Sequence, residues 1–98
     1  MRILRIKIRY FTTLYELAES AEELEIKERG TLSDLIRKVT LKYGKEARNY
    51  LYEKGEKGNV DPSIYFLING MNARTLAGLN TELKDGDIVA IIPPIGGG

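Results

Sequence analysis

From Leu4 to Tyr10 the sequence alternates strictly between apolar and charged side chains, and this alternation constrains the fold more than any other feature. Successive side chains of a β-strand point to opposite faces, so the pattern predicts a strand with one buried and one solvated face. Residues 22–27 alternate in the same way, with Leu24 and Ile26 expected to face inward. The two segments are therefore predicted to pair antiparallel, with a short helical turn in residues 12–18 between them.

The charged side chains of these two segments allow a functional interpretation beside a structural one. The cations Arg5, Lys7 and Arg9 form a row that suits either an anion site or the solvated face of a sheet. An acidic cluster follows, consisting of Glu19, Glu22, Glu23, Glu25 and Glu28. We interpret both sets as solvated surface and predict no metal site, because the acidic residues lack histidine neighbours and a regular ligand spacing.

A long helical period begins after Gly30. Thr31 followed three residues later by Asp34 resembles a capping box, in which hydroxyl and carboxylate satisfy backbone donors of the first turn. The apolar residues at helical spacing are Leu32, Leu35, Ile36, Val39 and Tyr43. Gly44 is a natural stop, and residues 46–52 are consistent with a helical continuation.

Two apolar segments, residues 64–68 and 88–92, are predicted strands without a fully solvated face. Asn69-Gly70 is a hairpin signal after the first, with a short return strand in residues 71–75. Strand, strand, helix, strand, return strand, strand is the order of a β-grasp (ubiquitin-like) α+β fold. We expect a mixed sheet of four to five strands on one main helix, with the first and last strands as parallel central neighbours.

The amino-acid composition excludes several kinds of reactive site and partner. The 98 residues contain neither cysteine nor histidine, which excludes disulfides, zinc fingers, thiol nucleophiles and histidine-based triads. Lys plus Arg number 15 against 14 Asp plus Glu, so the net charge of +1 gives no reason to expect nucleic acid as a partner. Apolar runs reach about five residues, against roughly 20 for a membrane span, and the N-terminus lacks a signal-peptide core. We expect a cytoplasmic protein that is not catalytic on its own.

The last residues are unsuited to a core. Three consecutive glycines, Gly96 to Gly98, carry a high entropic cost and no side chain to bury. Pro93-Pro94 ends the last strand and stiffens the base of an arm whose final four residues reach about 13 Å. We therefore expect a β-grasp domain over residues 1–94 and a flexible reactive tail over residues 95–98 that presents a terminal carboxylate.

The sequence resembles the MoaD/ThiS family of ubiquitin-like sulfur carriers, and within it the small subunit of molybdopterin synthase. The segments that carry the resemblance are residues 9–18, 31–35, 69–70 with 81–87, and 89–98, in the family's order over essentially the whole chain. The ending strand–Pro-Pro–x-x-Gly-Gly is the most specific part, and Gly96 stands where the family varies.

The resemblance implies a carrier cycle. An E1-like adenylyltransferase (MoaB/MoeB/ThiF type) would use ATP to convert the Gly98 carboxylate to an acyl-adenylate, and a sulfur donor would replace AMP to leave a thiocarboxylate. The large catalytic subunit of molybdopterin synthase (MoaE type) would then receive the loaded tail for sulfur addition to a cyclic pterin. The chain itself would bind no cofactor. The tail residues implied in partner binding are Pro93, Pro94, Ile95, Gly96 and Gly97.

An apolar surface beside the tail is expected to dock these partners. Phe11, Ile68 and Ile92 are the candidates, because the sheet has more apolar positions than one helix can cover; ordinary core is the alternative for each. Two other functions remain open. One is a ubiquitin-like modifier joined to lysines through Gly98, and the other is a β-grasp interaction module that is not conjugated.

Overall fold

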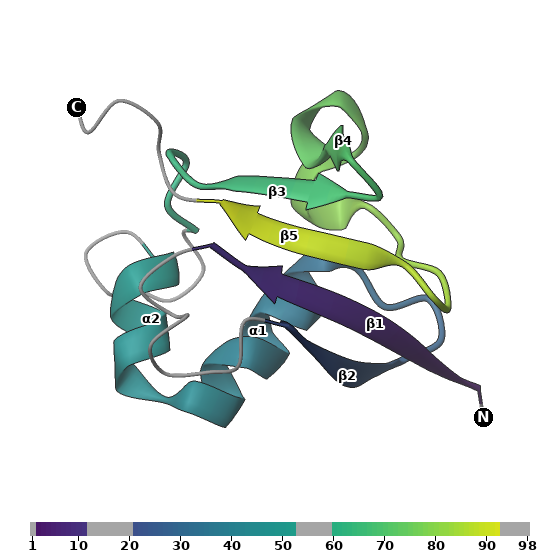
Figure 1. Ribbon diagram of the computed structural model, residues 1–98, viewed down its shortest axis with the longest axis horizontal. Coiled ribbons are helices and arrows are strands. Elements are labelled where there is room, and N and C mark those ends of the chain that lie inside the picture. Colours follow the sequence, from purple (N-terminus) through teal and green to yellow (C-terminus); the bar gives the residue numbers. More distant parts are fainter. Residues whose placement is uncertain (1, 12–20, 53–59, 93–98) are drawn as a thin grey trace.

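Five strands form one mixed sheet, and the helices pack against one of its faces (Figure 1). The computed structural model describes residues 2–11, 21–52 and 60–92. Its elements in chain order are β1 (Ile3–Tyr10), β2 (Ala21–Lys27), α1 (Leu32–Tyr43), α2 (Lys45–Leu51), β3 (Tyr65–Ile68), β4 (Met71–Asn72), the 3₁₀ turns η3 (Ala73–Thr75) and η4 (Gly78–Asn80), and β5 (Ile88–Ile92). This is the α+β, β-grasp architecture expected from the sequence.

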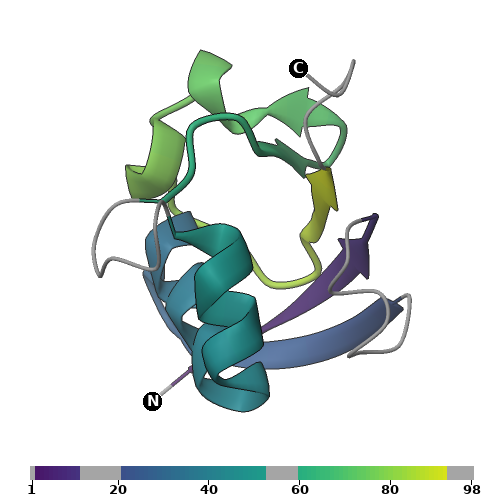
Figure 2. The same cartoon turned by 90° about the vertical axis from the view of Figure 1, so that its left-hand side faces the viewer.

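The sheet has the strand order β2-β1-β5-β3-β4. β1 pairs antiparallel with β2, with Arg5 opposite Glu25, and parallel with β5, with Ile8 opposite Val89. β3 runs antiparallel to both β5 and β4. The prediction that the first and last strands are parallel neighbours in the middle of the sheet is confirmed. In the perpendicular view, α1 and α2 lie on the same side of β1 and β5 (Figure 2).

The core lies between the helices and one face of the sheet. Along β1 every second residue is buried, from Leu4 to Tyr10, which is the face predicted from the alternation. Leu24 and Ile26 of β2 face the same side. The other buried apolar residues are Leu32, Leu35, Ile36, Val39, Ala47, Leu51, Ile64, Phe66, Ile68, Ala73, Leu83, Val89 and Ile91. The opposite, open face of the sheet has no covering helix among the described residues.

Both ends of α1 follow the sequence signals. The Asp34 amide donates to the Thr31 hydroxyl at 3.3 Å, and the Thr31 amide donates to the Asp34 carboxylate at 2.9 Å, so the capping box is complete. Gly44, with φ +74°, ends α1, and α2 begins at the next residue. A positive φ suits glycine because it has no Cβ, and it lets the two helices meet at an angle over the core.

The predicted return strand is shorter than expected. β4 spans only Met71–Asn72, and the chain then turns into η3. The Asn72 side chain accepts a hydrogen bond from the Arg74 amide at 2.9 Å, a local bond that competes with continuation of the strand. The helical turn expected in residues 12–18 lies outside the described residues. Within the described part of the chain, no helix has the length and apolarity needed to cross a membrane.

Candidate functional site

The site is the end of the sheet at which β5 finishes. Ile92 is the last residue of β5; Pro93, Pro94 and the predicted reactive tail, residues 95–98, follow it outside the described residues. Because β1 and β5 are parallel, both finish at the same end of the sheet (Figure 1). The Phe11 amide donates to the Ile91 carbonyl at 3.0 Å, so Phe11 lies directly beside the final residues of β5.

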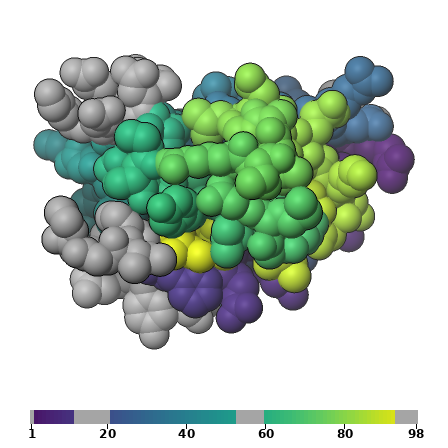
Figure 3. Space-filling model, turned by 90° about the horizontal axis from the view of Figure 1, so that it is seen from above, coloured from purple at the N-terminus to yellow at the C-terminus, as the bar shows by residue number. Residues whose placement is uncertain are grey.

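Phe11 and Ile92 lie on the open face, as a docking surface requires. Their chain neighbours Tyr10 and Ile91 are buried, and the alternation along each strand turns Phe11 and Ile92 to the opposite side. Phe11 is 50% exposed. In a space-filling view, a yellow part of β5 reaches the surface between purple β1 and green segments of the later chain (Figure 3).

Three further residues join this surface. In the register, Tyr65 is opposite Ile92 and Leu67 is opposite Ala90. We call the resulting surface the exit patch, and its residues are Phe11, Tyr65, Leu67, Ala90 and Ile92. The sequence analysis did not name Tyr65, Leu67 and Ala90. They occupy alternate, outward-facing positions of two apolar strands, and this alternation could have identified them.

The expectation that Ile68 lies on this surface is wrong. Ile68 is only 5% exposed and belongs to the core. It follows Leu67 by one residue, so its side chain points to the helix side of β3. An apolar run contains residues of both faces, and composition alone does not show which of them point outward.

Two arginines flank the exit patch. The Arg9 guanidinium lies 5.4 Å from the centre of the Phe11 ring, and that of Arg74 lies 5.2 Å from the Tyr65 ring. The residues directly opposite Arg9 are Ala21 in β2 and Ala90 in β5. Neither neighbouring strand therefore places a carboxylate opposite Arg9. The patch therefore offers a partner an apolar centre with a positive charge on either side.

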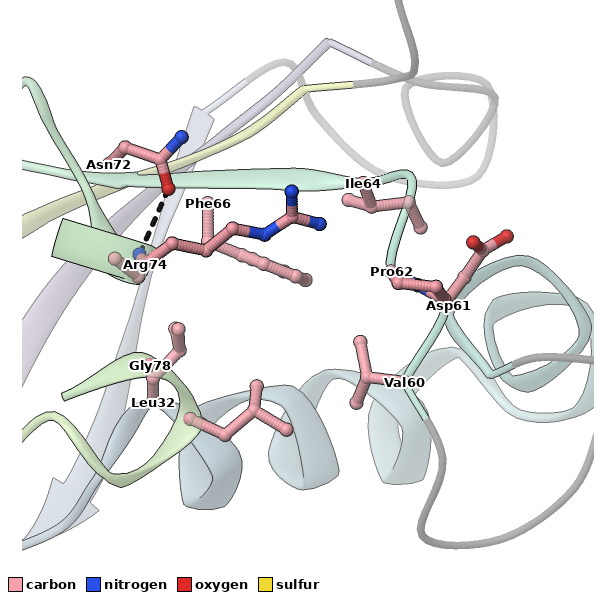
Figure 4. Close-up of a pocket in the computed structure, with 11 residues that line it drawn as sticks. Leu32, Val60, Asp61, Pro62, Ile64, Phe66, Asn72, Arg74 and Gly78 are labelled. Atoms are coloured by element: carbon pink, nitrogen blue, oxygen red, sulfur yellow. Dashed lines mark hydrogen bonds between the residues drawn. The ribbon is translucent and has the colours of Figure 1, made fainter. Parts of the chain in front are cut away.

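A pocket of about 220 Å³ lies on the other side of β3 (Figure 4). Phe66 and Ile64 lie on one side of it and Leu32 on the other, while the Arg74 side chain stretches across its opening. The Asp61 carboxylate accepts hydrogen bonds from the Ser63 amide and hydroxyl, and these bonds hold the pKa of Asp61 below its ordinary value. A stable carboxylate engaged with its own turn is a poor general base. We assign this pocket no catalytic role.

A polar cluster lies beneath the same end of the sheet, on its helix side. Glu22 accepts hydrogen bonds from Lys42 and from the Tyr43 hydroxyl, and thereby ties β2 to the last turn of α1. The interpretation of Glu22 as solvated is wrong, because its side chain is only 9% exposed. The ring of Tyr10 meets that of Tyr43 edge to face at 6.3 Å, and burial raises the pKa of Tyr10.

We expect replacement of Glu22 by Gln to destabilise the fold by about 1–2 kcal/mol at pH 7, the cost of weakening two charge-assisted hydrogen bonds. Burial alone would raise the pKa of Glu22, but the bonds from Lys42 and Tyr43 outweigh it and hold that pKa below the ordinary 4.5. A lowered carboxylate pKa stabilises the folded state above the unfolded-state pKa, and this contribution disappears as pH falls through the folded-state value. The difference between wild type and variant should therefore shrink below about pH 4.

Urea denaturation at several pH values measures this difference. Glu23→Gln is the matched control, because it makes the same change one residue along β2 at an exposed side chain, where loss of the charge should change stability little. An E22Q penalty that is the same at pH 3.5 and pH 7 would show that shape, and not charge, accounts for the effect.

The ThiS family model matches residues 8–98 of the chain. A candidate sulfur carrier protein of Archaeoglobus fulgidus is 38% identical over 77 residues, which cover 78% of this chain and 84% of the relative. The solution structure of small archaeal modifier protein 1 from Methanosarcina acetivorans is 33% identical, covers all of both chains and superposes with a TM-score of 0.83. A candidate molybdopterin converting factor subunit 1 from Pyrococcus furiosus is 26% identical, with a TM-score of 0.73, over 94% of this chain and 99% of that one.

The family match extends from the middle of β1 through the final glycines, and thus includes both the exit patch and the predicted tail. The chain therefore belongs to the ThiS family, with the ubiquitin-like fold of the sulfur carriers and small archaeal modifiers.

Proposed function

We propose that the chain is the sulfur-donating small subunit of a molybdopterin synthase, with the Gly98 carboxylate as its reacting group. The observation that carries the proposal is the exit patch. It borders the point where β5 continues into the glycine tail, so a partner bound there receives the tail as well. The paired prolines of the ending and the likeness to a molybdopterin converting factor subunit support the choice of pathway.

The reaction has two steps, both performed on the carboxylate by partner enzymes. In the first, a carboxylate oxygen of Gly98 attacks the α-phosphorus of ATP and pyrophosphate leaves, which converts a poor electrophile into an acyl-adenylate. In the second, hydrosulfide attacks the acyl carbon and AMP leaves, giving the thiocarboxylate. The chain contains neither cysteine nor histidine, so the base and the thiol groups of such a cycle belong to its partners.

Intact mass spectrometry tests this chemistry. After incubation with an E1-like adenylyltransferase, ATP and sulfide, the chain should gain the mass difference between sulfur and oxygen. Omission of ATP should prevent the gain. If the mass stays unchanged with an enzyme that is active on another carrier, the tail is not a substrate and the proposal fails.

A second candidate, a protein modifier, is favoured by the full-length likeness to small archaeal modifier protein 1. Both functions begin with the same adenylate, so the acceptor distinguishes them. Rescue of molybdoenzyme activity in cells that lack the small subunit supports the synthase. Lysine-linked conjugates that end in Gly98, without such rescue, support the modifier.

A further inference from the structure

We propose that the outer edge of β2, with the groove between β2 and α1, is a second docking site. Its occupant is an extended segment that adds to the sheet beside β2. The side chains of this segment alternate between apolar residues facing α1 and lysine or arginine facing the open side. We call this site the edge groove; the residues that line the groove are Ile26, Lys27, Gly30, Asp34, Arg37, Lys38 and Leu41. Two strands, β1 and β5, separate β2 from β3, so the edge groove is distant from most of the exit patch, and the proposal does not depend on the tail chemistry.

The backbone of β2 supplies the hydrogen-bonding groups. β2 is at the end of the strand order, so one side of it has no partner strand among the described residues. The Glu28 amide donates to the Arg2 carbonyl, and hydrogen bonds in an antiparallel pair recur at every second residue. The amides and carbonyls of Glu23 and Glu25 therefore point away from β1, where a further strand can bind them.

The groove beside this edge suits apolar side chains. It has a volume of about 420 Å³ and lies between Ile26 of β2 and the outer face of α1. Leu41, at its margin, is 75% exposed, an unusual exposure for a leucine on a helix that is otherwise packed on the core. A strand added to β2 would direct every second side chain toward this groove, where Leu41 would be covered.

Charge on the open side of the same edge selects a basic segment. Lys7 is opposite Glu23 and Arg5 is opposite Glu25 in the register, with 3.9 Å between the charged atoms of Arg5 and Glu25. A cationic column on β1 is thus followed by an anionic column on β2. The next strand continues the alternation only if its outward side chains are positive, because opposite charges in adjacent strands attract and like charges repel.

The same column disfavours a second copy of the chain as the occupant. In the antiparallel register that aligns two β2 strands over their full length, Glu23 of one copy lies opposite Glu25 of the other, which is destabilising. At the α1 side, Lys38 has no carboxylate partner among the described residues, whereas Arg37 contacts Asp34 at 3.4 Å. One α1-facing position near Lys38 therefore suits an acidic residue.

Titration with a capped peptide, Lys-Leu-Lys-Val-Lys-Asp-Lys, tests the proposal by two-dimensional NMR. The reverse-order peptide is included because a strand can add in either direction. We expect saturable shifts of the Glu23 and Glu25 amides with at least one of the two, and none at Phe11. A peptide with proline in place of both the central valine and the lysine that follows it lacks a backbone donor for either strand direction; this peptide and one with shuffled residue order should each bind about tenfold more weakly.

Charge exchange gives a second, independent measurement. Replacing the peptide lysines by glutamates should weaken binding to the wild type about tenfold, and the E23K/E25K variant should reverse this preference. Leu41→Ala should weaken binding severalfold, whereas Leu76→Ala, which truncates another exposed leucine, should leave it unchanged. L41A should form the thiocarboxylate like the wild type. Equal binding of the shuffled peptide, shifts confined to the exit patch, or no saturation at about 1 mM would each overturn the proposal.

Discussion

Removal of Gly97 and Gly98 is expected to abolish thiocarboxylate formation while leaving the folded domain intact. The deletion moves the terminal carboxylate back by about 7 Å at 3.3–3.6 Å per residue, which is far beyond the 3–3.5 Å distance that a reacting pair requires. Neither glycine has a side chain that contributes to the core. Intact mass after the adenylation and sulfide reaction measures the loss, and an unchanged melting curve shows that the fold is retained.

Gly96→Ala is the matched control for this deletion. It alters the tail without moving the carboxylate, at the position where the family resemblance places variation. We expect this variant to gain sulfur at a rate close to that of the wild type. If the truncated chain still carried out its cellular role, the glycines would be incidental, and the β-grasp domain would act as an interaction module without carrier chemistry.

The sequence predicted the fold well because its strongest signals are local and mutually consistent. The alternation along β1, the Thr31–Asp34 capping box and the Gly44 stop each depend on residues within a few positions of one another. The parallel pairing of β1 with β5 joins residues far apart in the sequence. It was still predictable, because crossover connections between parallel strands are right-handed and few layered α+β folds have this order of elements.

The site was harder to predict because it depends on register between distant strands. Phe11 and Ile92 were named as surface candidates, yet Ile68 was named with them, although it points into the core. The side of a strand to which a residue points follows from its pairing, and the apolar run from Ile64 to Ile68 does not show that pairing. Glu22 illustrates the converse: it is a charged residue at the same inward-facing alternate positions as Leu24 and Ile26, and it is held against the last turn of α1.

The second large effect is expected at the exit patch. We expect Phe11→Asp to lower the efficiency of adenylation of the chain at least about 30-fold, which corresponds to the roughly 2 kcal/mol typical of a central aromatic contact in an interface. The effect should appear in KM rather than in kcat, because the residue contacts the partner and not the reacting carboxylate. Pyrophosphate release at varied carrier concentration measures both constants.

Ile3→Asp is the matched control, because Ile3 lies on the same open face at the start of β1 and is 54% exposed, against 50% for Phe11, which directly follows the end of β1. Ile3 is at the end of the sheet farther from the tail. If both variants lost efficiency equally, a general charge effect on the sheet would explain the result. A loss confined to F11D would place the partner over the end of the sheet that leads into Gly98, where binding and presentation of the carboxylate are a single event.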